Sequence, residues 1–278
     1  MRLRFTKMHG LGNDFIVIDA INQGVNLSPE QIKRLSDRRF GIGCDQVLVI
    51  EPPTEADIDF NYRIFNQDGG EVEQCGNGAR CLARYVYDRQ LTGKNPILVK
   101  TKNRVMTMHL EANKLVRVDM GIPQLDPAQI PFQAEGPAAR YDIDVAGETY
   151  QVAAVSMGNP HTLLQVDDVD TAPVETLGPA LECHSRFPNR VNVGFMQIVD
   201  RNTIKLRVFE RGVGETQACG TGACAAVVAA NLNGLVSGRV KVSLPGGKLR
   251  IHWSGEGHQV VMLGDANLVH RGEIVKES

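Results

Sequence analysis

Two cysteines, Cys75 and Cys219, stand in nearly the same glycine-rich surroundings in the two halves of this 278-residue chain. The first opens the run Cys-Gly-Asn-Gly-Ala, and the second opens Cys-Gly-Thr-Gly-Ala. When segment 63–79 is laid over segment 207–223 without a gap, eight of the seventeen positions are identical. The shift of 144 residues (219 − 75) is about half of the chain, which indicates duplication of a whole domain rather than a short repeat.

A cysteine reacts as its thiolate, and the partial positive charge at a helix N-terminus lowers the pKa of a thiol placed there. The backbone N–H groups freed by the flanking glycines can bind a carboxylate. Two such loops predict a carboxylate held between two helix N-termini, with a sulfur on each side of its α-carbon. This arrangement suits inversion of a stereocentre, in which a base removes the α-proton from one face and an acid delivers a proton to the other. The α-proton of an amino acid is weakly acidic. Hydrogen-bond donors that neutralise the carboxylate are therefore expected to lower the activation barrier more than the acid and base themselves do.

Amide side chains repeat in nearly the same register as the cysteines. Asn13 follows a glycine as Asn159 does, and Gln46 lies in an apolar segment as Asn192 does. Each pair is separated by 146 residues. The order of asparagine, amide and cysteine segment is therefore kept in both halves.

Each cysteine segment is expected to join a strand to a helix. Residues 58–65 alternate apolar and polar side chains, the period of a half-buried strand, and a loop over 66–78 leads to a helix over 79–90. In the second half a strand and a glycine-rich loop lead to a helix over 223–231. Both cysteines are thus predicted to lie just ahead of a helix N-terminus.

Strands outnumber helices along the rest of the chain. We expect a Ser28-capped helix as far as about Arg38 and a hairpin around Ala146-Gly147. Further strands are expected at 3–8, 15–19, 46–50, 97–101, 104–111, 115–120, 141–145, 149–155, 162–166, 193–198, 204–209, 241–244, 249–253 and 260–263. The pattern predicts an α+β fold of two pseudo-symmetric domains, each a mostly antiparallel or mixed β-sheet wrapped around a central helix.

The composition is that of an ordinary globular protein, with a hydrophobic fraction of 42% and a net charge of −2. This charge gives no reason to expect nucleic acid or a membrane surface as a partner. The N-terminal residues lack the apolar run of a signal peptide, so we expect a cytoplasmic protein whose six cysteines are reduced thiols.

Five segments closely resemble those of the diaminopimelate epimerases. They are GLGNDF (10–15), QCGNGARC (74–81), GNPH (158–161), ERGVGET (210–216) and ACGTGAC (218–224). The resemblance implies an epimerase that needs no pyridoxal phosphate or other cofactor and no metal, and that interconverts LL- and meso-2,6-diaminopimelate for lysine and peptidoglycan synthesis. It also implies a homodimer. With the last strand returning to the first domain, the expected domains are 1–118 plus 264–278, which carries Cys75, and 119–263, which carries Cys219.

The resemblance also implies roles for individual residues. Cys75 and Cys219 would be the catalytic pair, and Glu210 and His161 would lie beside the reacting amino group and the sulfurs. Arg211 would bind the distal carboxylate. The reacting carboxylate would be bound by Gly76, Asn77, Gly220 and Thr221, and the rest of the substrate by Asn13, Gln46, Asn66, Asn159, Asn192 and Glu210.

Several alternatives remain open from the sequence alone. The cysteine segments could form a zinc site with Cys81 and Cys224, although the spacings of six (81 − 75) and five (224 − 219) do not fit a zinc ribbon. Cys219 and His161 could serve a cysteine hydrolase, in which loss of Cys75 would leave activity intact. A proline or hydroxyproline racemase also uses two cysteines, and a non-enzymatic binding module is a further alternative.

Some residues also have structural interpretations. The two segment cysteines could be buried structural thiols, which is the favoured interpretation for Cys81 and Cys224 inside the helices. His161 could be a turn residue and Glu210 a solvated loop carboxylate. Arg63 and Arg207, which match in both halves, could form structural ion pairs on their strands.

Overall fold

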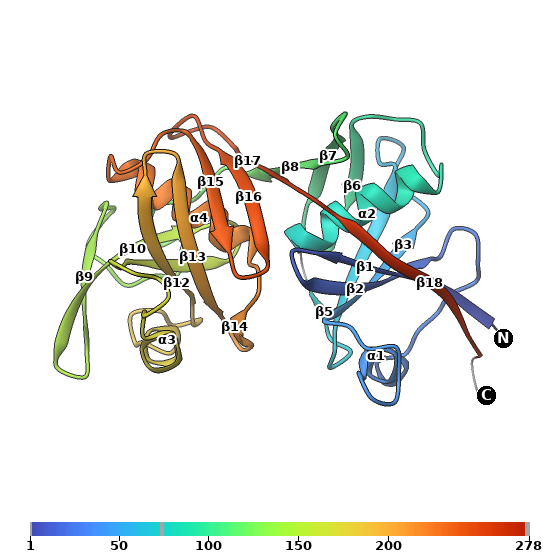
Figure 1. Ribbon diagram of the computed structural model, residues 1–278, viewed down its shortest axis with the longest axis horizontal. Helices are drawn as coiled ribbons and strands as arrows, with labels where there is room; N and C mark the ends of the chain where they lie inside the picture. Colours follow the sequence, from blue (N-terminus) through green and yellow to red (C-terminus); the bar gives the residue numbers. More distant parts are fainter. Residues whose placement is uncertain (1, 73–74, 276–278) are drawn as a thin grey trace. The chain divides into compact units, whose positions relative to one another are not determined.

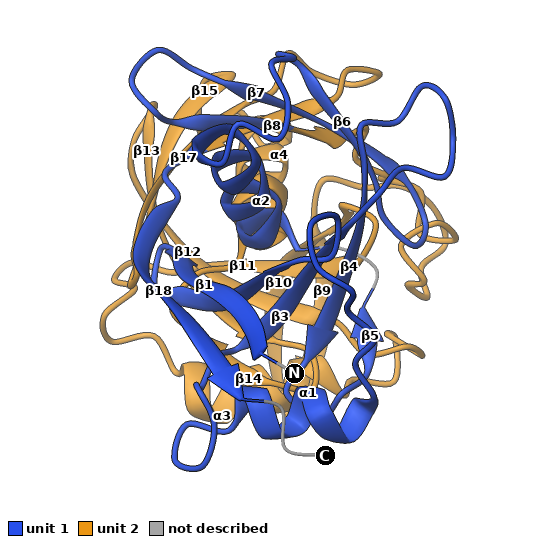
Figure 2. Cartoon of the chain, turned by 90° about the vertical axis from the view of Figure 1, so that its right-hand side faces the viewer, with its two compact units in different colours: residues 1–118, 264–278 blue, residues 119–263 orange. Residues whose placement is uncertain are grey.

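The computed structural model describes residues 2–72 and 75–275 (Figure 1). The chain forms two compact units, drawn in separate colours in Figure 2. Unit 1 comprises residues 1–118 and 264–278, and unit 2 comprises residues 119–263. Gln74, which belongs to one of the motifs quoted above, lies outside the described residues.

The helices and strands fall into two similar sets. The helices are α1 (Pro29–Ser36), α2 (Gly76–Asp88), α3 (Val174–Glu182) and α4 (Gly220–Leu232). The first eight strands are β1 (Arg2–Gly10), β2 (Asn13–Asp19), β3 (Gln46–Glu51), β4 (Phe60–Asn66), β5 (Glu71–Val72), β6 (Ile97–Lys100), β7 (Val105–Leu110) and β8 (Val116–Gly121). The others are β9 (Tyr141–Val145), β10 (Glu148–Ser156), β11 (Pro160–Gln165), β12 (Asn192–Asp200), β13 (Thr203–Glu210), β14 (Gly214–Thr216), β15 (Arg239–Leu244), β16 (Gly247–His252), β17 (Val260–Gly264) and β18 (Asn267–Val275). The predicted α+β class is confirmed.

The two units repeat one strand order. In unit 1, β1 and β2 pair antiparallel, β2 and β3 parallel, β3 and β4 antiparallel, and β4 and β6 parallel. The same four relations join β10 to β11, β11 to β12, β12 to β13, and β13 to β15 in unit 2. The registers also correspond, because Phe15 lies opposite Gln46 and His161 lies opposite Asn192.

Strand β18 explains why unit 1 is built from two segments of the chain. It pairs antiparallel with β1, as β9 pairs with β10 in unit 2 (Figure 1). Strands β1 and β10 occupy equivalent places, 146 residues apart (148 − 2). The end of the chain therefore supplies to unit 1 the edge strand that β9, directly before β10, supplies to unit 2.

One long helix in each unit lies against the inner face of its sheet. Helix α4 contacts strands β10 to β13 and β16, and its residues from Gly220 to Ala230 are all buried. A helix that is apolar on every side is stable only when it is covered all round. Helix α2 contacts β1, β2, β3 and β7, and keeps a polar edge near its C-terminal end at Arg84 and Asp88.

The shorter helices cover other apolar surface of the sheets. Ile32 and Leu35 of α1 pack in a cluster with residues of β1, β2 and β3. Leu177 and Leu181 of α3 join a corresponding cluster in unit 2. Within the described residues, no helix is both long enough and apolar enough to cross a membrane.

Local sequence signals predicted most elements but not all. Ser28 forms the predicted capping box with Gln31, and Ala146 and Gly147 both have positive φ (52° and 87°), as a tight hairpin turn requires. Helices α2 and α4 begin three residues earlier than expected, at Gly76 and Gly220, because the glycines belong to the first turn. Helix α3 was not predicted, since it contains a proline and lacks a side-chain N-cap.

Candidate active site: two cysteine clusters

Both segment cysteines are N-caps of the long helices. Cys75 and Cys219 have extended backbone conformations, and each Sγ accepts a hydrogen bond at 3.3 Å from the backbone N–H three residues on, that of Gly78 and Gly222 respectively. Sulfur here takes the place that a serine or aspartate oxygen occupies in an ordinary N-cap. The hydrogen bond and the helix dipole both favour the thiolate over the thiol.

Gly78 and Gly222, in the first turns of the two helices, are closely packed. A methyl group added to Gly78 would overlap Tyr62 Oη. At Gly222 it would lie 3.1 Å from Val208 Cγ2 and 3.2 Å from Cys219 Sγ. At Gly78 a side chain would force Tyr62 to move, whereas at Gly222 a side chain would be tight but would need only a small shift of its neighbours.

In unit 1, Cys75 lies beside two amide side chains, and we call Cys75, Asn13 and Asn77 the Cys75 cluster. The Cys75 thiol donates to Asn13 Oδ1 (3.7 Å), and Asn77 Nδ2 donates to the same oxygen (3.2 Å). Asn13 Nδ2 in turn donates to Asp45 Oδ2 (2.9 Å), which fixes the amide with its oxygen toward the sulfur. Arg80 fixes Asn77 similarly, because its guanidinium donates to Asn77 Oδ1 at 3.0 Å.

Gln46 and Asn66 lie opposite each other on β3 and β4. Gln46 Nε2 donates to Asn66 Oδ1 at 2.8 Å, while Gln46 Oε1 is buried without a hydrogen-bond partner. A buried acceptor without a partner is costly unless a ligand or water satisfies it. An N–H or O–H group of a ligand would be a donor of the required kind.

In unit 2, Thr221 is the centre of what we call the Cys219 cluster, comprising Cys219, Thr221, Asn159 and His161. Thr221 Oγ1 lies 3.5 Å from Cys219 Sγ and 3.0 Å from His161 Nε2, and it accepts from Asn159 Nδ2 at 3.3 Å. His161 Nε2 also lies 3.1 Å from Asn159 Oδ1. The cysteine is therefore connected to the imidazole through one hydroxyl group.

His161 is fully buried, and its Nδ1 has no hydrogen-bond partner. Burial lowers its pKa to about 3, and the positive charge of Arg211 contributes to the shift. The imidazole is therefore neutral at physiological pH, so it can donate or accept a hydrogen bond but carries no charge.

This burial predicts a pH-dependent stability. An unfolded chain binds a proton at histidine below about pH 6.5, whereas the folded chain does not until about pH 3, so the free energy of unfolding falls as the pH is lowered through that window. At pH 4.5 the His161 contribution to the loss is roughly 2 to 3 kcal/mol. Urea unfolding at pH 7 and pH 4.5 is expected to show a smaller loss for His161→Gln than for the wild-type protein. Equal losses would refute a neutral buried His161.

The other expected substrate residues of unit 2 lie at the ends of β12 and β13. Asn192 Nδ2 donates to the Pro160 carbonyl (2.9 Å), and its Oδ1 accepts from the Arg211 backbone N–H (2.9 Å). The Arg211 guanidinium donates to the Asn189 carbonyl at 3.1 Å. The half-buried Glu210 carboxylate accepts a short hydrogen bond of 2.5 Å from Thr216 Oγ1.

Arg63, Arg207, Cys81 and Cys224 have the structural roles that were considered for them, whereas His161 is not a turn residue because it lies buried in β11. Arg63 pairs with Glu71 at 2.9 Å, and Arg207 pairs with Glu215 at 2.6 Å, so the matched arginines form matched ion pairs. Cys81 and Cys224 are fully buried in their helices, and burial raises the pKa of Cys81 far above its usual value. None of the six cysteines, all of which lie within the described residues, forms a disulfide. No group of three histidine, cysteine or acidic side chains within residues 2–72 and 75–275 is arranged to hold a metal ion.

The structure adds residues that the sequence analysis missed. Asp45 and Arg80 orient the two amides beside Cys75, and Tyr62 lies beneath Gly78. Of these three residues, only Arg80 could have been noticed in the sequence, because it is a charged residue on a helix face that is otherwise apolar. Tyr62 reads as an ordinary apolar position of an alternating strand.

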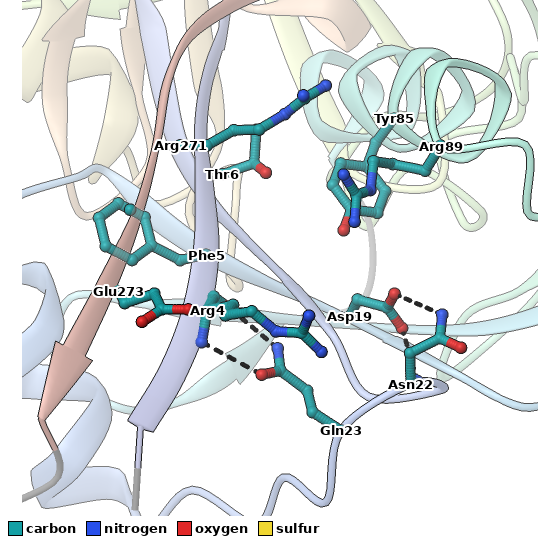
Figure 3. A pocket seen from close by; sticks show the side chains of 11 residues that line it. Arg4, Phe5, Thr6, Asp19, Asn22, Gln23, Tyr85, Arg89, Arg271 and Glu273 are labelled. Carbon is teal, nitrogen blue, oxygen red and sulfur yellow. Dashed lines mark hydrogen bonds between the residues drawn. The ribbon is translucent and has the colours of Figure 1, made fainter.

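A polar pocket of about 560 Å³ on unit 1 lies outside both clusters (Figure 3). Its lining includes Arg4, Asp19 and Arg89 but none of the residues of the Cys75 cluster. Asp19 is already bound by the backbone N–H groups of Ile21 and Asn22. This pocket is therefore separate from both cysteine clusters.

A family model and several known proteins match this chain over most of its length. The family model described as diaminopimelate epimerase matches residues 5–125 and 153–269. The diaminopimelate epimerases of Ectopseudomonas mendocina (strain ymp) and Aromatoleum aromaticum are each 58% identical over 274 residues, covering 99% of this chain and 99% of theirs.

Solved structures of lower sequence identity share the fold. A phenazine biosynthesis protein of the PhzF family from Bacillus anthracis aligns with a TM-score of 0.74 at 14% identity, covering 99% of this chain and 100% of that one. A hydroxyproline epimerase from Agrobacterium vitis, with trans-4-hydroxy-L-proline bound, aligns with a TM-score of 0.69 at 13% identity, covering 98% and 92%.

Proposed function

Because the chain belongs to the diaminopimelate epimerase family, we propose that it is an isomerase that interconverts LL- and meso-2,6-diaminopimelate. The observation that supports this most directly is the matched placement of Cys75 and Cys219, each the N-cap of a long helix in one half of a duplicated chain. A single capped thiol would serve many reactions. Two matched thiols serve a reaction that needs a base and an acid of the same kind.

The proposed reaction has two proton transfers at one α-carbon. One thiolate removes the α-proton and becomes a thiol, while the other thiol delivers its proton to the opposite face and becomes a thiolate. The electron pair of the broken C–H bond passes through the carboxylate-stabilised carbanion to the new C–H bond. The protein ends with the proton on the other sulfur, so the reverse reaction starts from that state. This chemistry uses no cofactor or metal.

The first-turn residues of the two helices would bind the reacting carboxylate. These are Gly76 and Asn77 in unit 1 and Gly220 and Thr221 in unit 2. Backbone N–H groups at a helix N-terminus are suited to a carboxylate, and their attraction grows as negative charge develops on it. Because these groups are held in place by the helix, little reorganisation is needed during the reaction.

The remaining side chains would recognise the rest of the substrate. We assign the distal carboxylate to Arg211, whose planar guanidinium can bind two oxygens at once. Glu210 and neutral His161 would lie beside the reacting amino group. The amides of Asn13, Gln46, Asn66, Asn159 and Asn192 would bind the remaining polar groups. We also propose that the enzyme is a cytoplasmic homodimer with no nucleic-acid or membrane partner.

Hydrogen–deuterium exchange at the α-carbon tests this function. In deuterated buffer, LL-diaminopimelate is expected to acquire deuterium at the inverted centre and to yield the meso isomer, as followed by NMR. L-Proline and trans-4-hydroxy-L-proline are the matched alternatives, because related two-cysteine racemases act on them. Deuterium exchange with the proline substrates alone would show that the proposed substrate is wrong. Exchange with none of the three amino acids would contradict the proposed function.

A further inference from the structure

Tyr62 presents a buried hydroxyl group that the proposed chemistry does not yet use. Only 2% of its surface is exposed, and Oη has no hydrogen-bond partner. Leaving a buried hydroxyl unsatisfied costs free energy, and phenylalanine would fill nearly the same space without that cost. A tyrosine at this position therefore indicates a hydrogen-bond partner for Oη that the structure does not show.

The hydroxyl lies against the first turn of α2. A methyl group on Gly78 would overlap Tyr62 Oη and would lie 3.5 Å from Cys75 Cβ. The Gly78 N–H meanwhile donates to Cys75 Sγ at 3.3 Å. Tyr62 Oη and the cysteine therefore border the same glycine. Burial raises the pKa of Tyr62 well above its usual value, and negative charge on Cys75 raises it further, so the phenol keeps its proton and remains a donor.

The second unit lacks this tyrosine. The shift of 144 residues that matches Arg63 with Arg207 matches Tyr62 with Leu206 (62 + 144). In unit 2 a hydroxyl reaches the cysteine from another place, because Thr221 Oγ1 lies 3.5 Å from Cys219 Sγ. The residue of unit 1 that matches Thr221 is Asn77, whose amide is engaged by Asn13 and Arg80. Tyr62 of β4 therefore brings a hydroxyl group to the glycine near Cys75, whereas Thr221 of α4 brings one to Cys219.

We propose that Tyr62 is a positioning residue whose hydroxyl donates a hydrogen bond to Cys75 Sγ when that sulfur becomes a thiolate. This deepens the proposed function and rests on it only in requiring that Cys75 form a thiolate. A movement of the sulfur or of the phenol during proton transfer brings the two groups into contact. The hydrogen bond from Tyr62 would set the pKa of Cys75 independently of the pKa of Cys219. The two protonation states of the cysteine pair could then have similar free energies.

The test compares the two cysteines within one molecule. Iodoacetamide alkylation is measured against pH in wild-type protein and in Tyr62→Phe, and the modified Cys75 and Cys219 peptides are quantified by mass spectrometry. Cleavage by trypsin after Arg80 separates Cys75 from Cys81. Tyr62→Phe is expected to raise the pH midpoint for Cys75 by about one unit, or to slow its alkylation about tenfold below the midpoint. The midpoint for Cys219 should stay unchanged.

Two further measurements separate this role from a structural one. Tyr62→Phe should unfold at the same or a higher temperature, because it removes an unsatisfied hydroxyl. Replacement of Tyr62 by 3-fluorotyrosine, a more acidic donor, should move the Cys75 midpoint downward. An unchanged Cys75 midpoint in both variants, or a shift that Cys219 shares, overturns the proposal.

Kinetics provide an independent measurement. The acidic limb of the pH profile of kcat/KM should move to higher pH in Tyr62→Phe, equally for LL- and meso-diaminopimelate because the overall equilibrium constant is unchanged. Alkylation needs no turnover, so a chain that failed to epimerise diaminopimelate would still report on the contact between Tyr62 and Cys75. The two proposals can therefore fail separately.

Discussion

Replacing either Cys75 or Cys219 with alanine is expected to lower kcat for epimerisation by at least about 1,000-fold, because inversion needs both a base and an acid at the α-carbon. The measurement is conversion of LL- to meso-diaminopimelate, followed by chiral chromatography. Each variant keeps one thiolate, which can remove a proton from its own face and return solvent deuterium to that face. Each should therefore exchange deuterium into one configuration without inverting it, and the two variants should prefer opposite configurations.

Cys183→Ala is the matched control for these variants. Cys183 is the one cysteine of the six classed as exposed, and it belongs to neither cluster, so its loss should leave turnover unchanged. Full activity in Cys75→Ala would favour a hydrolase that uses Cys219 and His161 alone. Full activity in both alanine variants would exclude two-thiol chemistry altogether.

Arg211→Met is expected to lower kcat/KM for diaminopimelate by about 100-fold, mostly through KM. Removing one partner of a charge-assisted, bidentate contact leaves the substrate carboxylate unpaired, which costs about 2 to 5 kcal/mol in binding. The backbone N–H of residue 211 would still donate to Asn192, so the local fold should persist. Steady-state kinetics with LL-diaminopimelate provide the measurement.

Arg201→Met is the control for this prediction. It removes the same charge from an exposed turn between β12 and β13, where the residue contributes a backbone carbonyl to Ser237. Its kinetics should match those of the wild-type protein. An unchanged KM in Arg211→Met would show that other residues bind the distal carboxylate. A fall in kcat without a change in KM would show that Arg211 acts in the chemical step.

Much of the local structure around the cysteines could be predicted from the sequence because its determinants are close together in the chain. The cysteine, the glycines and the following helix lie within one segment, so the N-cap was predicted to within three residues. The amides Gln46 and Asn192 lie on strands whose apolar pattern is clear, and the register of each strand follows from the pattern of its buried face. For Arg63 and Arg207, which lie on strands, the sequence left open a structural ion pair, and both residues form one.

By itself the sequence determined the duplication, the strand–glycine–helix units and the two capped thiols, all of which depend on short-range geometry. Only the tertiary structure decided that β18 completes the sheet beside β1, that His161 is buried and neutral, and that Asp45 and Arg80 orient the amides of the Cys75 cluster. It also decided that Tyr62 reaches Gly78 from a neighbouring strand. These contacts join residues far apart in the chain, and their free energy depends on packing and burial that no local pattern records.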